Sequence, residues 1–380
     1  MTTNLRTLVS AYRTLKNAQR PFVLATVVET LGSTYRKAGA RMLITEDGEF
    51  HGIIGGGCFE GDLLERARRV FAGGHPDLVF YDMRAPEDEL WGLGLGCNGA
   101  VRLLLERLDA AQGFDPLPIM ESCLNRRERG VLATVCARNG VDDAVGRHVF
   151  VQDSEGLSRH WPAWLMDGAR RVQQTKAPVL AEHRAGRGVV TVFYDWLQSP
   201  PHLLIIGAGP DAVPLANLAR ALDWEVTVVD HRGAYADARR FAAADRVLTT
   251  APEALVERVE IDTVDAAVLM THNIGYDERF LRALAGTAIG YIGLLGPAAR
   301  RDRLLSKLGP AAAALRDRVS GPVGLDIGAR LPEEIGLAIM AELIAHFRNH
   351  QFSTPRAAAH ERVIAADGSF NTRFLNTRCV

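Results

Sequence analysis

The chain has 380 residues, more than one ordinary core accommodates, so about two domains are expected. Hydrophobic residues make up 47% and charged residues 23% of it, a balance typical of folded proteins and not of disordered ones. The formal net charge of −1 provides no global field toward polyanions, so neither nucleic acid nor a membrane surface is an expected partner.

The N-terminus predicts cytoplasmic residence. Its first 20 residues are amphipathic and charged, without the apolar core of a signal peptide. No uninterrupted apolar run approaches the roughly 20 residues that a membrane-spanning helix needs. The five cysteines are widely spread and contain no CxxC pair, which favours reduced thiols over a disulfide framework or a zinc knuckle.

In the first half the pattern predicts a mixed α/β (α+β) domain that is rich in glycine. Apolar residues at helical spacing predict helices over 3–19 and 58–74. Asp47-Gly48 is a hairpin turn signal between two strands, 41–45 and 49–54. Further strands are expected at 21–29, 99–108, 130–138 and 188–194.

In the second half short apolar runs alternate with helix-length segments, which predicts a Rossmann-like, doubly wound parallel sheet. The expected strands are 202–207, 225–230, 246–250, 266–270 and 290–296, with a helix over 210–221 after the first. Ser199-Pro200-Pro201 is the linker candidate. We therefore expect an N-terminal domain over 1–198, a Rossmann-like domain over 199–350 and a polar tail over 351–380.

A dinucleotide fingerprint follows the first of these strands. Gly207, Gly209 and Ala212 form a GxGxxA turn that opens a helix. Gly207 permits the tight turn, Gly209 lets the backbone approach a pyrophosphate, and Ala212 keeps helix and strand close. Asp230 ends the second strand 23 positions after Gly207, the spacing of an acid that binds a ribose 2′-hydroxyl.

Three alternatives remain open for this turn. The acid favours NAD over NADP, but His231 and Arg232 follow it and are suited to meet a phosphate instead. The turn also suits a Rossmann fold that binds nothing. His272 follows the strand 266–270, at the sheet edge where ligands bind, and is either a ligand contact, an acid–base group or a cap of the next helix.

A second glycine-rich turn, Gly55-Gly56-Gly57-Cys58, lies between a strand and a helix. Successive glycines expose backbone amides at a helix N-terminus and suit an anion cradle. A thiol at Cys58 would have its pKa lowered by the helix dipole, and as a thiolate it could hold a soft metal or accept sulfur. The alternative is a tight turn with a buried structural cysteine.

Two further loops carry related features. In Trp91–Gly99 glycines alternate with apolar residues around Cys97, so the backbone passes close to a ligand or to another segment. The stretch 32–41 combines hydroxyl side chains with Arg36, Lys37 and Arg41. That loop suits phosphate binding, and almost equally a surface loop with solvated cations.

Six stretches together resemble the XdhC/CoxI family in their order along the chain. They are GSTYRKAGARMLI, GIIGGGCFEGDLLERA, WGLGLGCNG, THNIGYDERFLRAL, YIGLLGPAARRDRLL and GLDIGARLPEEIGLAIMAEL. In the family the loop around Cys97 often reads GCGG, whereas here it reads GCNG; asparagine tolerates a positive φ better than most residues.

The resemblance implies an accessory chaperone rather than a catalyst. Such a factor binds molybdopterin/molybdenum cofactor, protects it, promotes its sulfuration and inserts it into a molybdenum hydroxylase apoenzyme of the xanthine dehydrogenase or CO dehydrogenase type. The resemblance also implies a homodimer and contact with a cysteine desulfurase. The alternative is an NAD(P)-dependent oxidoreductase, with His272 as proton donor, or a binding protein regulated by NAD or a related dinucleotide.

Overall fold

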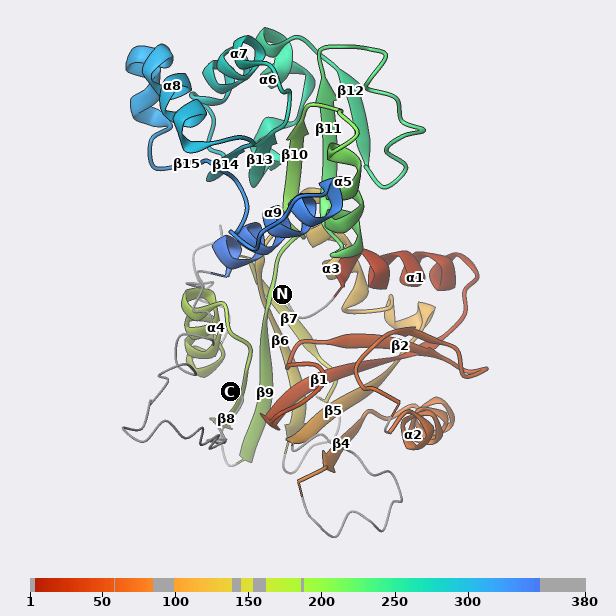
Figure 1. Ribbon diagram of the computed structural model, residues 1–380. Coiled ribbons are helices and arrows are strands. Elements are labelled where there is room, and N and C mark those ends of the chain that lie inside the picture. Colours follow the sequence, from red (N-terminus) through yellow and green to blue (C-terminus); the bar gives the residue numbers. More distant parts are fainter. Residues whose placement is uncertain are drawn as a thin grey trace, which may run out of the picture. The chain divides into compact units, whose positions relative to one another are not determined.

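The chain divides into two compact units, Met1–Pro201 and His202–Val380. A computed structural model describes residues 4–57, 59–84, 99–138, 145–152, 162–185 and 188–348 (Figure 1). The division falls after Pro201, three residues past the predicted end of the first domain, and the predicted tail 351–380 lies outside the described residues. Within the described ranges, no helix has both the length and the apolar character needed to cross a bilayer.

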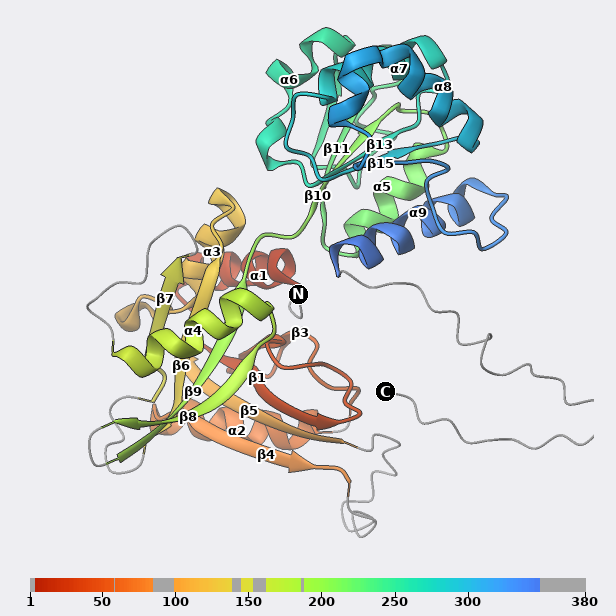
Figure 2. The same cartoon turned by 90° about the vertical axis from the view of Figure 1, so that its left-hand side faces the viewer.

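The first unit contains two antiparallel sheets, as expected of a mixed α/β domain. One has the order β3-β2-β1-β5-β4 and the other β7-β6-β9-β8 (Figure 2). The strands are β1 (Phe22–Gly32), β2 (Arg41–Thr45), β3 (Phe50–Gly52), β4 (Asp77–Asp82), β5 (Gly99–Leu108), β6 (Gly130–Arg138), β7 (His148–Gln152), β8 (Val179–Ala185) and β9 (Gly188–Leu197). The helices are α1 (Leu5–Asn17), α2 (Glu60–Gly73), α3 (Leu117–Arg126) and α4 (Ala163–Thr175).

The two sheets pack against each other through alternating apolar side chains. Leu24 of β1 and Leu132 of β6 share one cluster, with α1 and α3 closing its end. Helix α2 covers the other face of the first sheet, and α4 the other face of the second. Because both faces of each sheet are covered, β1, β5, β6 and β9 are buried over most of their length and appear as apolar runs in the sequence, which is why they were predictable.

Buried charges are paired across the interface between these sheets. Arg41 on β2 donates to Asp195 on β9 at 2.7 Å, with the two side chains 2% and 7% exposed. His148 on β7 lies 3.2 Å from Glu106 on β5. Pairing is what makes such burial tolerable, because an isolated ion in a protein interior is very costly.

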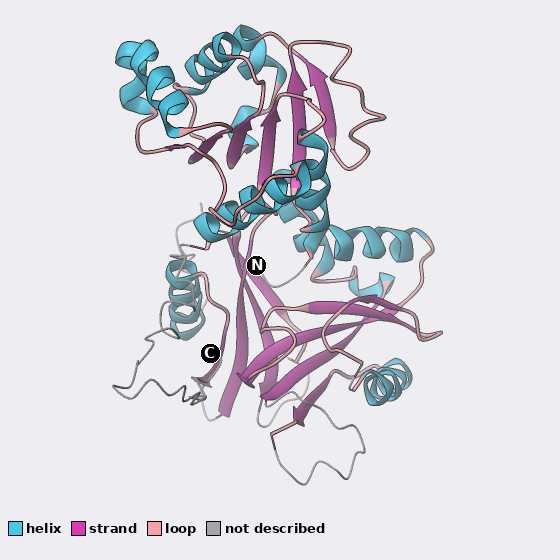
Figure 3. Cartoon of the chain, in the orientation of Figure 1, coloured by secondary structure: helices cyan, strands magenta, loops and turns pink. Residues whose placement is uncertain are grey.

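The second unit contains the predicted parallel sheet, whose strands are drawn as magenta arrows in Figure 3. Its strand order is β12-β11-β10-β13-β14-β15. Its strands are β10 (His202–Ile206), β11 (Glu225–Asp230), β12 (Arg246–Thr249), β13 (Ala266–Leu269), β14 (Tyr291–Leu294) and β15 (Val319–Ser320). Its helices are α5 (Ala212–Ala221), α6 (Leu255–Arg258), α7 (Ile274–Leu284), α8 (Ala298–Leu308) and α9 (Pro332–Phe347). This strand order is that of the dinucleotide-binding Rossmann fold.

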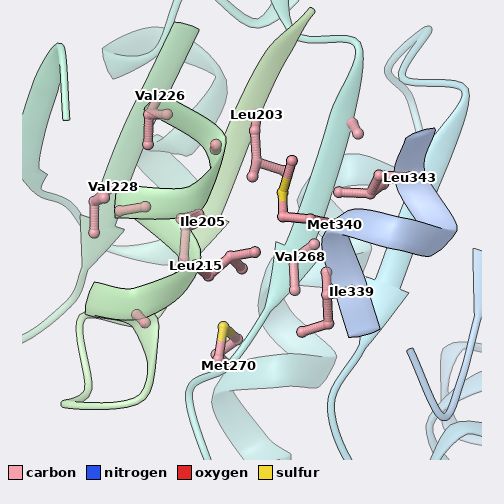
Figure 4. Packing of buried hydrophobic residues seen from close by; sticks show 14 of the residues in the cluster. Leu203, Ile205, Leu215, Val226, Val228, Val268, Met270, Ile339, Met340 and Leu343 are labelled. Atoms are coloured by element: carbon pink, nitrogen blue, oxygen red, sulfur yellow. The ribbon is translucent and has the colours of Figure 1, made fainter. Parts of the chain in front are cut away.

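Both faces of the parallel sheet are covered by helices, so its strands are apolar on both sides. On one face α5 and α9 pack against β10 and its neighbours, with Ile205, Leu215 and Ile339 fully buried (Figure 4). On the other face, Leu204 and Ile206 pack with residues of α7 and α8. This arrangement leaves the carboxyl edge of the sheet to carry the loops that hold the candidate site.

Candidate functional site

The centre of the parallel sheet contains its topological switch point. Strands β10 and β13 are neighbours there, and the chain leaves them toward opposite halves of the sheet. Gly207 follows β10, and Thr271 and His272 follow β13. Ligands of open α/β sheets bind at such a crevice.

The glycine turn has the backbone that its sequence predicts. Gly207 has φ +115°, and a Cβ at this position would collide with the backbone of Met270, the residue that follows β13. Ala212 is fully buried at the start of α5. Within the described ranges the amide of Gly209 donates to no protein acceptor, whereas the amide of Ala208 donates to Asp230 at 2.8 Å.

Asp230 is turned inward toward this glycine turn, and its side chain is 0% exposed. One carboxylate oxygen accepts from the amide and Nε of Arg232, at 2.8 and 3.0 Å. The other accepts from Ala208 and from Nη2 of Arg232, at 2.8 and 2.9 Å. Burial alone would raise the pKa of Asp230, but these donors hold it below its usual value. A ribose hydroxyl would have to displace Arg232 to reach this carboxylate.

Asp211 and His272 join the two sides of the switch point. Nε2 of His272 lies 2.7 Å from Oδ2 of Asp211, and the other carboxylate oxygen of Asp211 lies over Gly209. His272 has φ +55°, an uncommon backbone conformation for a residue other than glycine. Asn273, not His272, caps α7, because its side chain accepts from the amides of Gly275 and Tyr276. The structure therefore places His272 beside the turn, paired with an acid.

In the first unit the loop after β1 lies beside both Gly99 and the glycine turn 55–57. Gly32 at the end of β1 pairs with Gly99 at the start of β5, where a Cβ would collide with the carbonyl of Ser33. The ring of Tyr35, in the loop after β1, lies against Gly56. Tyr35 is 60% exposed, and Gly56 and Gly57 are exposed beside it.

The amide cradle at Gly55–Gly57 already holds an anion, the carboxylate of Glu60. Its two oxygens accept from the amides of Gly57 and Phe59, at 3.0 and 3.1 Å. A Cβ at Gly55 would lie 2.8 Å from the same carboxylate, so the glycine makes room for it. The amides of this turn are thus arranged to bind an anion, and in this structure the anion is the Glu60 side chain of α2.

The three cations predicted around 32–41 have different surroundings. Lys37 is exposed and Arg36 is half-buried. Arg41 is 4% exposed and paired with Asp195. Because a buried, neutralised guanidinium offers no donor at the surface, the phosphate role predicted for Arg41 does not fit the structure.

Both predicted thiol sites, Cys58 and Cys97, lie outside the described residues. The two described cysteines are buried. Burial, with Glu128 nearby, raises the pKa of Cys123 to about 12, and burial likewise raises that of Cys136, so neither thiol is reactive at neutral pH. Among the described residues, no three His, Cys, Asp or Glu side chains are grouped so as to hold a metal ion.

Sequence reasoning missed Tyr35, Glu60, Asp211 and Arg240. Tyr35 had a local signal, since it is an aromatic residue inside a predicted loop. Glu60 is the acid in the first helical turn after three glycines, a position at which acids stabilise helices. Asp211 did have a signal in the sequence, because a negatively charged side chain is unexpected inside a turn that binds anions. Arg240, whose Nη1 donates to the carbonyl oxygen of Ala208 at 3.1 Å, had no signal, because 32 positions separate the two.

The strand order and the glycine turn define a class: a two-unit protein whose second unit is a Rossmann domain of dinucleotide-binding type. Residues 203–343 match the model of the XdhC Rossmann domain, and residues 15–82 match that of the XdhC and CoxI family. A Bacillus subtilis protein, named as a probable subunit of xanthine dehydrogenase, is 35% identical over 90% of this chain and 97% of its own length. The chain belongs to the XdhC and CoxI family.

Two more distant relatives agree with this assignment. The "Molybdenum cofactor insertion chaperone PaoD" of Escherichia coli is 25% identical, over 92% of this chain and 89% of that protein. The crystal structure of a protein described as a xanthine dehydrogenase, from Bacillus halodurans, superposes with a TM-score of 0.71 at 28% identity. That match covers 93% of this chain and 99% of the other.

Proposed function

We propose that this protein is a maturation factor that carries molybdenum cofactor as its cargo and inserts it into a xanthine dehydrogenase- or CO dehydrogenase-type apoenzyme. Its family membership supports this role, as does the name of the relative that is a molybdenum cofactor insertion chaperone. Protection of the cofactor, its sulfuration with a cysteine desulfurase, a homodimeric state and cytoplasmic residence belong to the same proposal.

The observation that carries the proposal is that the loop after β1 lies beside both Gly99 and the glycine turn 55–57. A pterin with a phosphate tail needs an aromatic surface, backbone amides and a cation. Tyr35, Gly57 and Lys37 offer these together. Glu60 stands where the phosphate would bind, so cargo and carboxylate compete for the same amides.

Pterin retention tests this site. The full chain is produced together with molybdopterin biosynthesis and purified, and its pterin is quantified by mass spectrometry. Lys37→Ala should lower retention by about ten-fold, because a charge-assisted hydrogen bond to phosphate is lost. Glu60→Gln should raise retention, because the amides lose an ionic competitor.

The matched control is Lys16→Ala, which removes an exposed lysine from α1 in the same unit. It should leave retention unchanged. A wild-type protein that purifies without pterin would refute the cargo role. Equal losses of pterin retention in Lys37→Ala and Lys16→Ala would show that the loop after β1 is not part of the site.

A second candidate function is regulation of loading by a nucleotide in the Rossmann unit. The strand order and the free Gly209 amide favour it over a fold that has lost its ligand. Oxidoreductase chemistry has less support, because the sequence shows no second constellation of residues that would position a substrate beside His272. Calorimetric titration with a nucleotide, with and without bound pterin, tests the coupling, since equal affinities in both states exclude it.

A further inference from the structure

The loop after β11 brings two arginines and a tyrosine to the glycine turn. We call Arg232, Tyr235 and Arg240 the arginine–tyrosine cluster. The guanidinium of Arg232 lies 3.8 Å from the ring centroid of Tyr235, and that of Arg240 lies 5.7 Å from it. Nη1 of Arg240 donates to the carbonyls of Ala208 and Tyr235, each at 3.1 Å. The cluster is therefore held beside Ala208, between the two glycines of the turn.

This position is where the adenosine ribose of a Rossmann ligand lies, between the glycine turn and the end of the second strand. In that arrangement an acid at the strand end binds a bare ribose, whereas an arginine nearby accommodates a ribose phosphate. Asp230 does not offer the first kind of contact. A carboxylate has about four acceptor positions, and donors from Ala208 and Arg232 fill all four.

The charge at this position is positive. Among the described residues Arg240 forms no ion pair, although the carboxylate of Asp237, which is paired with Arg239 at 2.7 Å, is near enough to interact with its charge. Arg232 uses Nε and Nη2 on Asp230 and keeps Nη1 for another acceptor. Burial lowers the pKa of His231 although Asp230 is 3.3 Å away, so at neutral pH the charge comes from the arginines.

We propose that the Rossmann unit selects a nucleotide with a phosphomonoester on its adenosine ribose, which Arg240 and Arg232 bind. The expected ligand is of the NADP type, with a 2′-phosphate. Guanidinium groups are suited to this task because their planar donors match phosphate oxygens. This inference concerns the second unit and does not depend on the cargo proposed for the first.

Calorimetry on the full chain with three adenosine probes tests the proposal. We expect adenosine 2′,5′-bisphosphate to bind at least about ten-fold more tightly than adenosine 5′-monophosphate, because charge-assisted hydrogen bonds form to the added phosphate. A preference for the 3′,5′-bisphosphate would support the phosphomonoester site with a ligand of the coenzyme A type. Equal affinities for all three probes, or no binding of any, would overturn the proposal.

Two variants assign the preference to the cluster. Arg240→Gln should remove most of the gap between bisphosphate and monophosphate, while Arg239→Gln, which deletes the same charge one position away, should leave it intact. Equal effects of the two would assign the preference to overall charge and refute the role of Arg240. If Arg240→Gln fails to fold, the comparison of the three probes on the wild-type protein still decides the ligand class. Pterin retention is measured separately and reports on the first unit alone.

Discussion

At the scale of single residues, the glycine turn combines an anion site with an acid of its own. Asp211 holds one carboxylate oxygen over Gly209 and the other against His272. A pyrophosphate that approaches Gly209 therefore meets a negative charge first.

Replacing this acid should strengthen nucleotide binding. We expect Asp211→Asn to raise the affinity for adenosine 5′-diphosphate by about five-fold, because a like charge about 4 Å away costs ~1 kcal/mol in water. Isothermal titration measures the change. Asp237→Asn, in the loop after β11, serves as control and should have a smaller effect. Unchanged or weaker binding by Asp211→Asn would show that its carboxylate does not oppose the pyrophosphate.

The sequence predicts residues whose role is local and misses those whose role depends on a distant partner. Gly207 and Ala212 follow from a motif of six residues, and both have the predicted environment. Arg41 looked like a loop cation, but its partner lies 154 positions away, where nothing nearby in the sequence indicates it. The position of Asp230 at the end of the second strand followed from the sequence. The hydrogen-bond donors that occupy its carboxylate did not, because they depend on side-chain directions.

At the scale of elements, five of the six strands of the parallel sheet were predictable, whereas β15 and three strands of the first unit, β4, β7 and β8, were not. Strands β10, β11 and β13 are buried on both faces and therefore appear as continuous apolar runs. Strand β7 has only three consecutive apolar residues, and all of its residues are half-buried, so its sequence gives a weak signal. The sequence of β8 gives a similarly weak signal, and none of its residues is fully buried.

Helix α9 completes the sheet face that carries the glycine turn, because it packs on α5. Ile339 is fully buried there, whereas Leu337 on the same helix is 53% exposed. We expect Ile339→Ala to lower the free energy of unfolding of the second unit by about 2–5 kcal/mol through lost burial and a residual cavity. Leu337→Ala should change it by less than about 0.5 kcal/mol.

Urea titration followed by circular dichroism measures both variants. Equal losses in the two would mean that α9 contributes to stability through its helical propensity and not through the packing of Ile339. A loss in Ile339→Ala alone would show that α9 stabilises the second unit through the packing of Ile339.

At the scale of the whole molecule, each unit has apolar cores of its own. Every cluster of buried residues among the described ranges draws its members from one side of the division after Pro201. A unit of this size can bury enough apolar surface to fold independently.

Separate production of His202–Val380 should therefore yield a folded protein. We expect a cooperative urea transition, with a free energy of unfolding of about 5–15 kcal/mol, and the same preference among adenosine probes as in the full chain. A fragment without a cooperative transition would show that the second unit needs the first one to fold.

The pair formed by Arg41 and Asp195 constrains how sequences of this kind diverge. Loss of either partner leaves an unpaired ion buried between the two sheets and lowers the free energy of unfolding by about 3–5 kcal/mol. Exchange of both residues for apolar residues of similar volume is nearly neutral. Drift at one of these positions is therefore blocked until the other changes too. Although they belong to strands far apart in the chain, we expect the two positions to covary as if they were a single site.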